Sequence, residues 1–201
     1  MIFHKFEQLQ KDDRVLETHK KQTINIYTDG ACSGNQFETN LGGWGAILEY
    51  GGNTKELHGG EPNTTNNRME LTALIMGLSN LTKKNYNVSV FSDSAYMIDC
   101  LRKRWYEKWR VNGWRTADKK PVENRDLWEK LLAFLPDYEF RFYLVKGHIG
   151  KGASEKKLRD EFGRFVRHNG DGFSFEEFVL IAEQNNRADE LANLGIGEGS
   201  E

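Results

Sequence analysis

The hydrophobic residues of this chain change their spacing from one part of the sequence to the next. Between residues 23 and 60, apolar and polar residues alternate, which is typical of half-buried strands. From residue 64 onward, segments with apolar residues three and four positions apart are separated by short alternating segments, so helices are expected to connect the later strands. A hairpin meander followed by alternating helices and strands predicts an α/β fold, with a mixed five-stranded sheet flanked by helices.

The individual elements follow from the same spacing. Strands are expected at residues 23–29, 43–50, 54–60, 88–92 and 139–145. The turn signal Gly51-Gly52-Asn53 joins the second and third of these strands as a hairpin. Helices are expected after the N-cap candidates Thr64 and Thr65, near 96–101, over 121–135, and as a short final helix around 188–194.

Length and composition favour one domain with short appendages. The 201 residues are enough to bury a core without disulfides. Residues 1–22 are polar and predict an N-terminal extension, 23–195 the domain, and 196–201 a tail. Apolar runs reach only five residues, and the two cysteines are Cys32 and Cys100. We therefore expect a reduced, cytoplasmic setting, no membrane span, and no disulfide scaffold or cysteine metal site.

Positive charge is concentrated in one segment. Residues 102–120, called here the basic tryptophan segment, hold eight Lys or Arg, two acidic residues and three of the five tryptophans. The formal net charge of the whole chain is -2, so the remainder is acidic. This asymmetry indicates a polyanionic partner that is held at one place on the protein.

Carboxylates stand at the ends of predicted strands. Asp29 ends the first strand, Asp93 ends the fourth, and Glu70 lies in the first turns of the helix between them. Ligands of open mixed sheets collect beyond the strand ends, where three such acids can converge on a divalent cation. An acid after a strand is also commonly a turn former or a helix cap, so spacing alone leaves both interpretations open.

Six motifs in order carry a resemblance to a known family. They are YTDGACSGN at 27–35, TTNNRMEL at 64–71, SDS at 92–94, the segment 109–128 with GWRTADKKPV and NRDLW, VKGH at 145–148, and NRADELA at 186–192. Together they resemble type 1 ribonuclease H (ribonuclease HI). The resemblance implies a ribonuclease H-like fold and a metal-dependent endonuclease that hydrolyses the RNA strand of RNA–DNA hybrids, leaving 3′-hydroxyl and 5′-phosphate ends.

The resemblance also implies a catalytic set. In the family, four carboxylates bind the metals, and by motif these are Asp29, Glu70, Asp93 and Asp189. Two Mg²⁺ ions are implied, with Mn²⁺ as a substitute; one ion activates a water and the other stabilises the leaving 3′ oxygen. Asp29 is the expected bridging ligand. His148 matches the family's mobile histidine, which is thought to help proton transfer or product release, although a lone loop histidine is also common.

Substrate-binding residues are implied by the same motifs. In the loops and at the helix start they are Cys32, Asn35, Thr65, Asn66 and Asn67, which are otherwise ordinary loop formers. The basic tryptophan segment matches the family's protruding handle and supplies Trp105, Lys108, Trp109, Arg110, Trp114, Lys119 and Lys120. Trp105 and Trp109 are expected to pack against each other or against DNA sugars, whereas Trp128 is expected in the core. Many relatives carry Gln where this chain has Ala95, so one contact to the RNA strand is expected to be missing.

An insert separates the last two motifs, where the family has a short loop. Residues 149–184 have helical spacing twice, which predicts two helices joined by a turn at 168–172. That turn partly matches an EF-hand loop, but its ligand count is wrong and a Gly-rich turn is preferred. The insert flanks His148 and Asp189 and puts the geometry of both in doubt; a lid and an added hybrid contact are both open.

Two other functions compete with the ribonuclease H prediction. One is a catalytically impaired module that binds RNA–DNA hybrids because the insert displaces His148 or Asp189. The other is a nuclease of the same broad fold that acts on other nucleic acids. The four retained carboxylates favour the enzyme, and the handle and the paired asparagines favour the hybrid. We expect the chain to act as a monomer.

Overall fold

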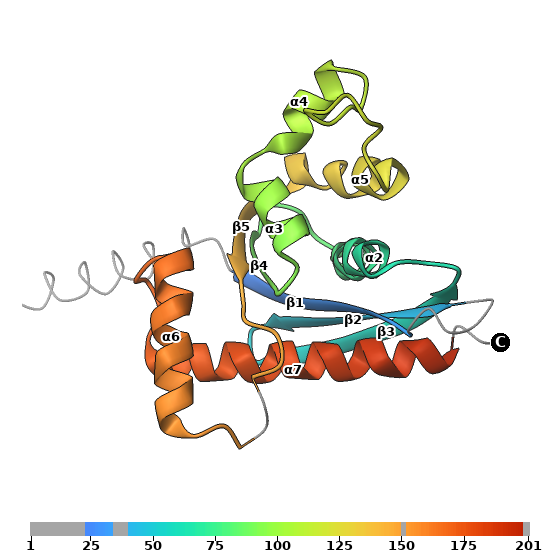
Figure 1. Cartoon of the computed structure of the whole chain (residues 1–201). Coiled ribbons are helices and arrows are strands. Elements are labelled where there is room, and N and C mark those ends of the chain that lie inside the picture. The colour runs from blue at the N-terminus through green and yellow to red at the C-terminus, as the bar shows by residue number, and fades with distance from the viewer. Residues whose placement is uncertain (1–22, 34–39, 150–151, 199–201) are drawn as a thin grey trace, which may run out of the picture.

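The computed structural model describes residues 23–33, 40–149 and 152–198. Five strands form one mixed sheet in the order β3-β2-β1-β4-β5 (Figure 1). Their bounds are β1 Thr23–Cys32, β2 Leu41–Tyr50, β3 Asn53–Pro62, β4 Asn87–Ser92 and β5 Glu139–Leu144. β1, β2 and β3 pair antiparallel, while β4 and β5 run parallel to β1. The predicted meander followed by parallel strands is confirmed.

Helices cover both faces of this sheet. α2 (Asn66–Ser79), α3 (Ala95–Arg102) and α5 (Arg125–Leu132) lie on one face, with α4 (Trp105–Val111) beyond them (Figure 1). α7 (Phe175–Glu198) runs along the other face, and α6 (Glu155–Asn169) lies across its start. Alternate β1 side chains therefore enter two separate cores: Ile24 and Ile26 join the core under α2, and Tyr27 joins the core under α7.

The start of α2 follows the predicted capping signal. Thr65 has extended backbone angles, and its side chain accepts a hydrogen bond from the backbone N–H of Arg68. An N-cap of this kind satisfies one of the free N–H groups of the first helical turn. This cap places Glu70 in the second turn of the helix, on the side that faces β1.

The predicted helix over 121–135 is shorter in the structure. Pro121 forms an isolated antiparallel bridge with Arg115, and Asn124 has a φ of 56°. The chain therefore becomes helical only at Arg125, and a short 3-10 helix, η1 (Leu135–Asp137), follows α5. A proline and a left-handed residue each interrupt helical hydrogen bonding, which the apolar spacing alone does not reveal.

The second half of the insert is continuous with the last motif. The prediction of a separate short final helix is wrong, because residues from Phe175 to Glu198 form one helix of 24 residues. The first insert helix and the turn after it are confirmed as α6 and the residues that follow. The segment 175–194 contains neither proline nor a helix-ending glycine, so the two predicted helices have no stop signal between them.

Glycines let α7 approach the sheet closely. A Cβ on Gly43 would lie 1.9 Å from the carbonyl oxygen of Ala192, and one on Gly45 would lie 2.2 Å from that of Ala188. A Cβ on Gly195 would likewise lie 2.1 Å from the carbonyl oxygen of Gly59. The backbones of helix and sheet are therefore in direct contact around Asp189.

Some predicted features lie outside the described residues. They are the N-terminal extension at 1–22, the binding candidate Asn35, and the end of the tail at 199–201. Among the residues that are described, no helix is both long and apolar enough to cross a membrane.

Candidate active site

Three of the predicted metal ligands converge. Single carboxylate oxygens of Asp29, Glu70 and Asp93 all lie within 4.8 Å of one another. The convergence follows from the strand register, because Thr28 of β1 pairs with Ser92 of β4. The residue that follows each of them in the chain is an aspartate, Asp29 or Asp93. Glu70 reaches the same point from α2, whose backbone lies against Gly30.

Burial and mutual repulsion disfavour ionisation of this cluster. Asp29 is 5% exposed and Glu70 is 7% exposed. Burial, followed by the charges of Asp93 and Asp189, raises the pKa of Asp29 from 3.8 to about 8. Burial, followed by the charges of Asp29 and Asp93, raises the pKa of Glu70 well above its ordinary value. Burial is also the main cause of the raised pKa of Asp93.

A divalent cation fits this arrangement. The carboxylates have few compensating donors: the N–H of Gly30 donates to Asp29 Oδ1 at 2.7 Å, and the Ser92 hydroxyl lies 3.5 Å from Glu70 Oε2. Hard oxygen ligands with raised pKa values, grouped within one cation's reach, match the donor set that Mg²⁺ and Mn²⁺ prefer. A cation of this kind removes the repulsion that the ionised carboxylates otherwise suffer.

Asp189 and His148 lie together at the rim of the cluster. His148 Nδ1 is 3.7 Å from Asp189 Oδ2, and their side chains are 78% and 27% exposed. Asp189 is close enough for its charge to raise the pKa of both Asp29 and Asp93. The insert therefore leaves His148 and Asp189 beside the three clustered carboxylates.

A glycine brings the histidine loop close to the cluster. Residues 145–149, called here the histidine loop, follow β5. A Cβ on Gly147 would lie 2.0 Å from Asp93 Oδ2, so any other residue here would push the Asp93 carboxylate out of this position. His148 itself has a φ of 53°, an unusual conformation for a residue other than glycine. The loop thus has little freedom to accept other residues at 147.

The predicted substrate residues at the start of α2 face outward. Thr65 and Asn66 are exposed, and Asn67 and Cys32 are half-buried. Cys32 ends the strand that carries Asp29, and Asn66 and Asn67 begin the helix that carries Glu70. Cys100, by contrast, is fully buried.

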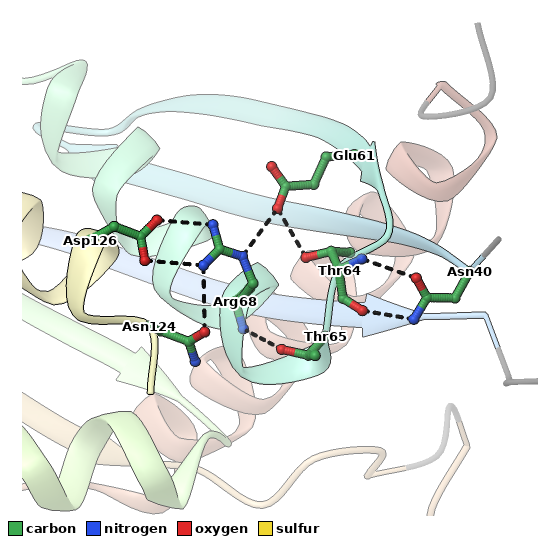
Figure 2. Close-up of polar contacts among 7 residues, drawn as sticks. All are labelled: Asn40, Glu61, Thr64, Thr65, Arg68, Asn124 and Asp126. Atoms are coloured by element: carbon green, nitrogen blue, oxygen red, sulfur yellow. Dashed lines mark hydrogen bonds and ion pairs between the residues drawn. The ribbon is translucent and has the colours of Figure 1, made fainter. Parts of the chain in front are cut away.

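Arg68 joins this helix start to the beginning of α5 (Figure 2). Its guanidinium donates two hydrogen bonds to the carboxylate of Asp126, at 3.1 and 3.0 Å, and one of 3.5 Å to Asn124 Oδ1. Glu61 lies 3.7 Å from Arg68 Nε. A bidentate arginine–carboxylate pair fixes relative orientation as well as adding energy. The start of α2 and the start of α5 are therefore held together.

A second connection in Figure 2 fixes the residue before the cap. The Asn40 side chain donates to the carbonyl of Thr64 at 2.7 Å and accepts from its N–H at 3.0 Å. This pair attaches the chain that leads into β2 to the start of α2.

The basic tryptophan segment forms α4 and the turn after it. Trp109 packs on Trp128 and Trp114, with ring centroids 5.6 and 6.3 Å apart. Trp128 is fully buried and its indole N–H donates to Tyr96 Oη at 2.8 Å, so its predicted core position is confirmed. Trp105 is 37% exposed, with Lys103 Nζ 5.3 Å from its ring centre. The aromatic rings that pack on Trp109 are thus those of Trp114 and Trp128. Trp105, which was expected to pack on Trp109 or on DNA sugars, is not its main ring contact.

The outer surface of this segment is cationic. A groove with a volume of about 480 Å³ lies beside α4. Trp105, Trp109, Lys108 and Arg115 contribute to its lining. The exposed residues among the predicted hybrid contacts here are Trp105, Lys108, Arg110, Lys119 and Lys120. A groove with aromatic walls and a cationic rim suits a sugar–phosphate backbone.

Side chains in and beside the EF-hand-like turn make hydrogen bonds within the protein. The Asn169 side chain is bonded to the backbone of Leu144, and Glu177 and Ser174 form a reciprocal capping box at the start of α7. The preferred interpretation, a turn in a helical hairpin, agrees with these contacts.

Several residues near the site were not identified from the sequence. Asn169 bonds Leu144, just before the histidine loop, Asn186 bonds Ile149 at the end of that loop, and Asn185 has a buried amide without a partner among the described residues. Their signal was present only as polar residues on apolar helix faces. Gly147 could have been found from its position between a strand end and the motif histidine.

Comparisons with known proteins agree with the geometry. The family model RNase H matches residues 21–196. The chain is 41% identical over 180 residues to a protein named Ribonuclease H from Chlorobaculum parvum, covering 90% of this chain and 99% of that one. The crystal structure of LC9-RNase H1, a type 1 RNase H with the type 2 active-site motif, aligns with a TM-score of 0.57 at 25% identity over 82% of this chain and 85% of that one.

A further solved structure shares the fold. LC11-RNase H1 in complex with an RNA/DNA hybrid aligns with a TM-score of 0.52 at 22% identity, covering 89% of this chain and 99% of that one. The matched range of the family model contains all four candidate carboxylates and the whole insert. The chain is a member of the ribonuclease H family.

Proposed function

We propose that this protein hydrolyses the RNA strand of RNA–DNA hybrids as an endonuclease, leaving 3′-hydroxyl and 5′-phosphate ends. The observation that carries the proposal is the cluster of Asp29 and Glu70, which are buried, and Asp93, which is half-buried, with Asp189 at its rim. These carboxylates would hold two Mg²⁺ ions, which would stabilise the charge that develops on the phosphate during hydrolysis. Mn²⁺ is the expected substitute.

The other residues of the site have separate tasks. His148 is exposed beside Asp189, in a position to exchange protons with solvent and with the leaving strand. The Asp189 carboxylate lies beside the imidazole, with Oδ2 at 3.7 Å from Nδ1. Because all these groups come from one chain, the protein acts as a monomer in this proposal.

Hybrid recognition combines two surfaces. Cys32, Thr65, Asn66 and Asn67 contact the strands near the carboxylates, where 2′-hydroxyls distinguish RNA from DNA. The family motif adds Asn35 to this set, although it lies outside the described residues. The handle residues Trp105, Trp109, Trp114, Lys108, Arg110, Lys119 and Lys120 hold the sugar–phosphate backbone farther along the duplex. The Arg68–Asp126 pair connects the start of α2 to α5, the helix that follows the handle in the chain.

The direct test is cleavage of end-labelled RNA–DNA hybrid beside single-stranded and double-stranded RNA of the same sequence. Each substrate is incubated with Mg²⁺, Mn²⁺ or EDTA, and Asp29→Asn accompanies the wild type. The proposal requires metal-dependent cleavage of the hybrid alone, abolished in the variant. Tight hybrid binding without cleavage in either metal would instead identify a binding module, and cleavage of all three substrates would identify a less selective nuclease.

A further inference from the structure

We propose that two asparagines position the catalytic histidine, Asn169 from the insert and Asn186 from the part of α7 that follows the insert. The inference rests on the proposed function of His148. It concerns the histidine loop, residues 145–149: Asn169 bonds Leu144, the residue just before the loop, and Asn186 bonds Ile149, the last residue of the loop. We call these two contacts the brace.

The first contact of the brace caps the open edge of the sheet. β5 is one of the two edge strands of the sheet, and Leu144 is its last residue. The Asn169 amide donates to the carbonyl of Leu144 at 2.9 Å and accepts from its N–H at 3.0 Å. One side chain thereby satisfies both backbone groups of an edge residue, as a neighbouring strand would do. The residue that follows begins the histidine loop.

Arg102 makes this contact rigid. It comes from the end of α3, and its Nε donates to the carbonyl of Phe142 at 2.7 Å. Its terminal nitrogens donate to the carbonyl of His168, at 3.3 Å, and to Asn169 Oδ1. The end of α6 is therefore attached both to β5 and to α3, so Asn169 cannot change its rotamer without breaking several hydrogen bonds.

The second contact holds the other end of the loop. Asn186 Nδ2 donates to the carbonyl of Ile149 at 2.7 Å. Asn186 lies three residues before Asp189 on α7. The same helix therefore holds the end of the loop and carries the carboxylate beside His148. Ile149 is 3% exposed and packs in the core that also contains Phe165 and Phe178 of the insert.

The consequence is a histidine whose position depends on the insert. Between the two contacts, Gly147 lies against Asp93 and His148 has a left-handed backbone. A loop this short, with both ends fixed, restricts where the imidazole can go, although the ring itself is exposed. Proton transfer is sensitive to position, because displacement of a catalytic group by about 1 Å can cost up to roughly 100-fold in rate.

The test is a set of kinetic cycles on the full chain. Asn169→Ala and Asn186→Ala are made in the wild type and in His148→Ala. Asn80→Ala is the matched control, since Asn80 also bonds a backbone carbonyl, at 2.9 Å, at the distant end of α2. Given the usual range of general acid–base effects, we expect each brace variant to lower kcat about 3- to 30-fold with KM changed less than about twofold. In the His148→Ala background the same substitutions should have almost no further effect.

A second readout does not depend on activity. In metal-free protein, the backbone amide of His148 should have an order parameter near ~0.85 in the wild type and below ~0.6 when Asn169 and Asn186 are both alanine. Asn80→Ala should leave it unchanged. This measurement decides the positioning of the loop even if the protein proves not to cleave hybrids.

The outcomes separate the two proposals. Equal losses of kcat in the presence and absence of His148 would overturn the brace, because the asparagines would then act on stability alone. An unchanged order parameter would overturn it as well. A wild type that cleaves hybrids while His148→Ala is fully active would overturn the positioning role and leave the hydrolase intact. Absence of cleavage with the expected change in the order parameter would overturn the hydrolase and leave the brace.

Discussion

Replacing Asp29 with Asn should stabilise the metal-free protein while it abolishes catalysis. The substitution keeps the shape of the side chain and the acceptor for the Gly30 N–H, which lies 2.7 Å from Oδ1. It removes a carboxylate that is 5% exposed and faces two other acids. Catalytic sites commonly carry such local destabilisation, which ligands relieve.

The magnitude follows from the pKa. Asp29 has a pKa near 3.8 when unfolded and about 8 in the folded protein. Between those values the folded state binds a proton that the unfolded state has lost, so stability falls as pH rises from about 4 to about 8. At about 1.4 kcal/mol per pKa unit the full shift is an upper limit of about 6 kcal/mol. Because Glu70 also retains its proton over part of this range, the repulsion is lower, and we expect Asn to add about 1–3 kcal/mol at pH 8 and under about 1 kcal/mol at pH 5.

The assay is urea denaturation in EDTA at pH 5 and pH 8, repeated with Mg²⁺. Asp118→Asn is the control, because it removes the same charge from an exposed turn. Mg²⁺ should raise the stability of the wild type more than that of Asp29→Asn. If the Asp29 variant is no more stable than the wild type at pH 8 in EDTA, or if its advantage is the same at both pH values, the cluster is not a source of repulsion and the electrostatic argument is refuted.

Three further predictions concern the substrate side of the site. Ala95→Gln should tighten hybrid binding several-fold by adding one contact to the RNA strand, and equal affinity by fluorescence anisotropy would contradict this. Lys108→Gln together with Lys120→Gln should reduce the slope of log K against log salt concentration by about 1 for each phosphate that is no longer neutralised, which titrations at several salt concentrations measure. Gly147→Ala should lower kcat by at least about tenfold, because the new Cβ would lie 2.0 Å from Asp93 Oδ2. Circular dichroism should show that the fold of the variant is intact. Full activity would show that the loop can move away.

The strands and the start of α2 were predictable from local sequence. Alternating residues such as Ile24 and Ile26 define β1 without any tertiary information, and Thr65 marked the start of α2 through its capping preference. In both cases one short segment contains the whole signal. The carboxylate cluster needed more, because spacing alone left other roles open for these acids, and Asp29 comes beside Asp93 only through the pairing of β1 with β4.

The connections between segments were not predictable in this way. The Asn169 contact to Leu144 spans 25 residues, and the Arg68 contact to Asp126 spans 58. Neither position has a local reason to be asparagine or arginine. The sequence predicted two helices where the structure has the single helix α7, and the reason is different. Apolar spacing shows that each segment is helical. Whether two such segments form one helix depends on the residues between them.

The glycine contacts of α7 determine how far the fourth carboxylate lies from the other three. At Gly43, Gly45 and Gly195, the backbones of the helix and the sheet are in direct contact. No smaller residue exists that would let the helix lie closer to the sheet. Any side chain there would push the helix outward. Oxygen-to-metal distances of about 2.1 Å for Mg²⁺ and about 2.4 Å for Ca²⁺ differ by only a few tenths of an ångström, which is comparable to such a displacement. At the proposed metal site, the distance between the Asp189 carboxylate and a bound ion would therefore depend on residues that never touch the ion.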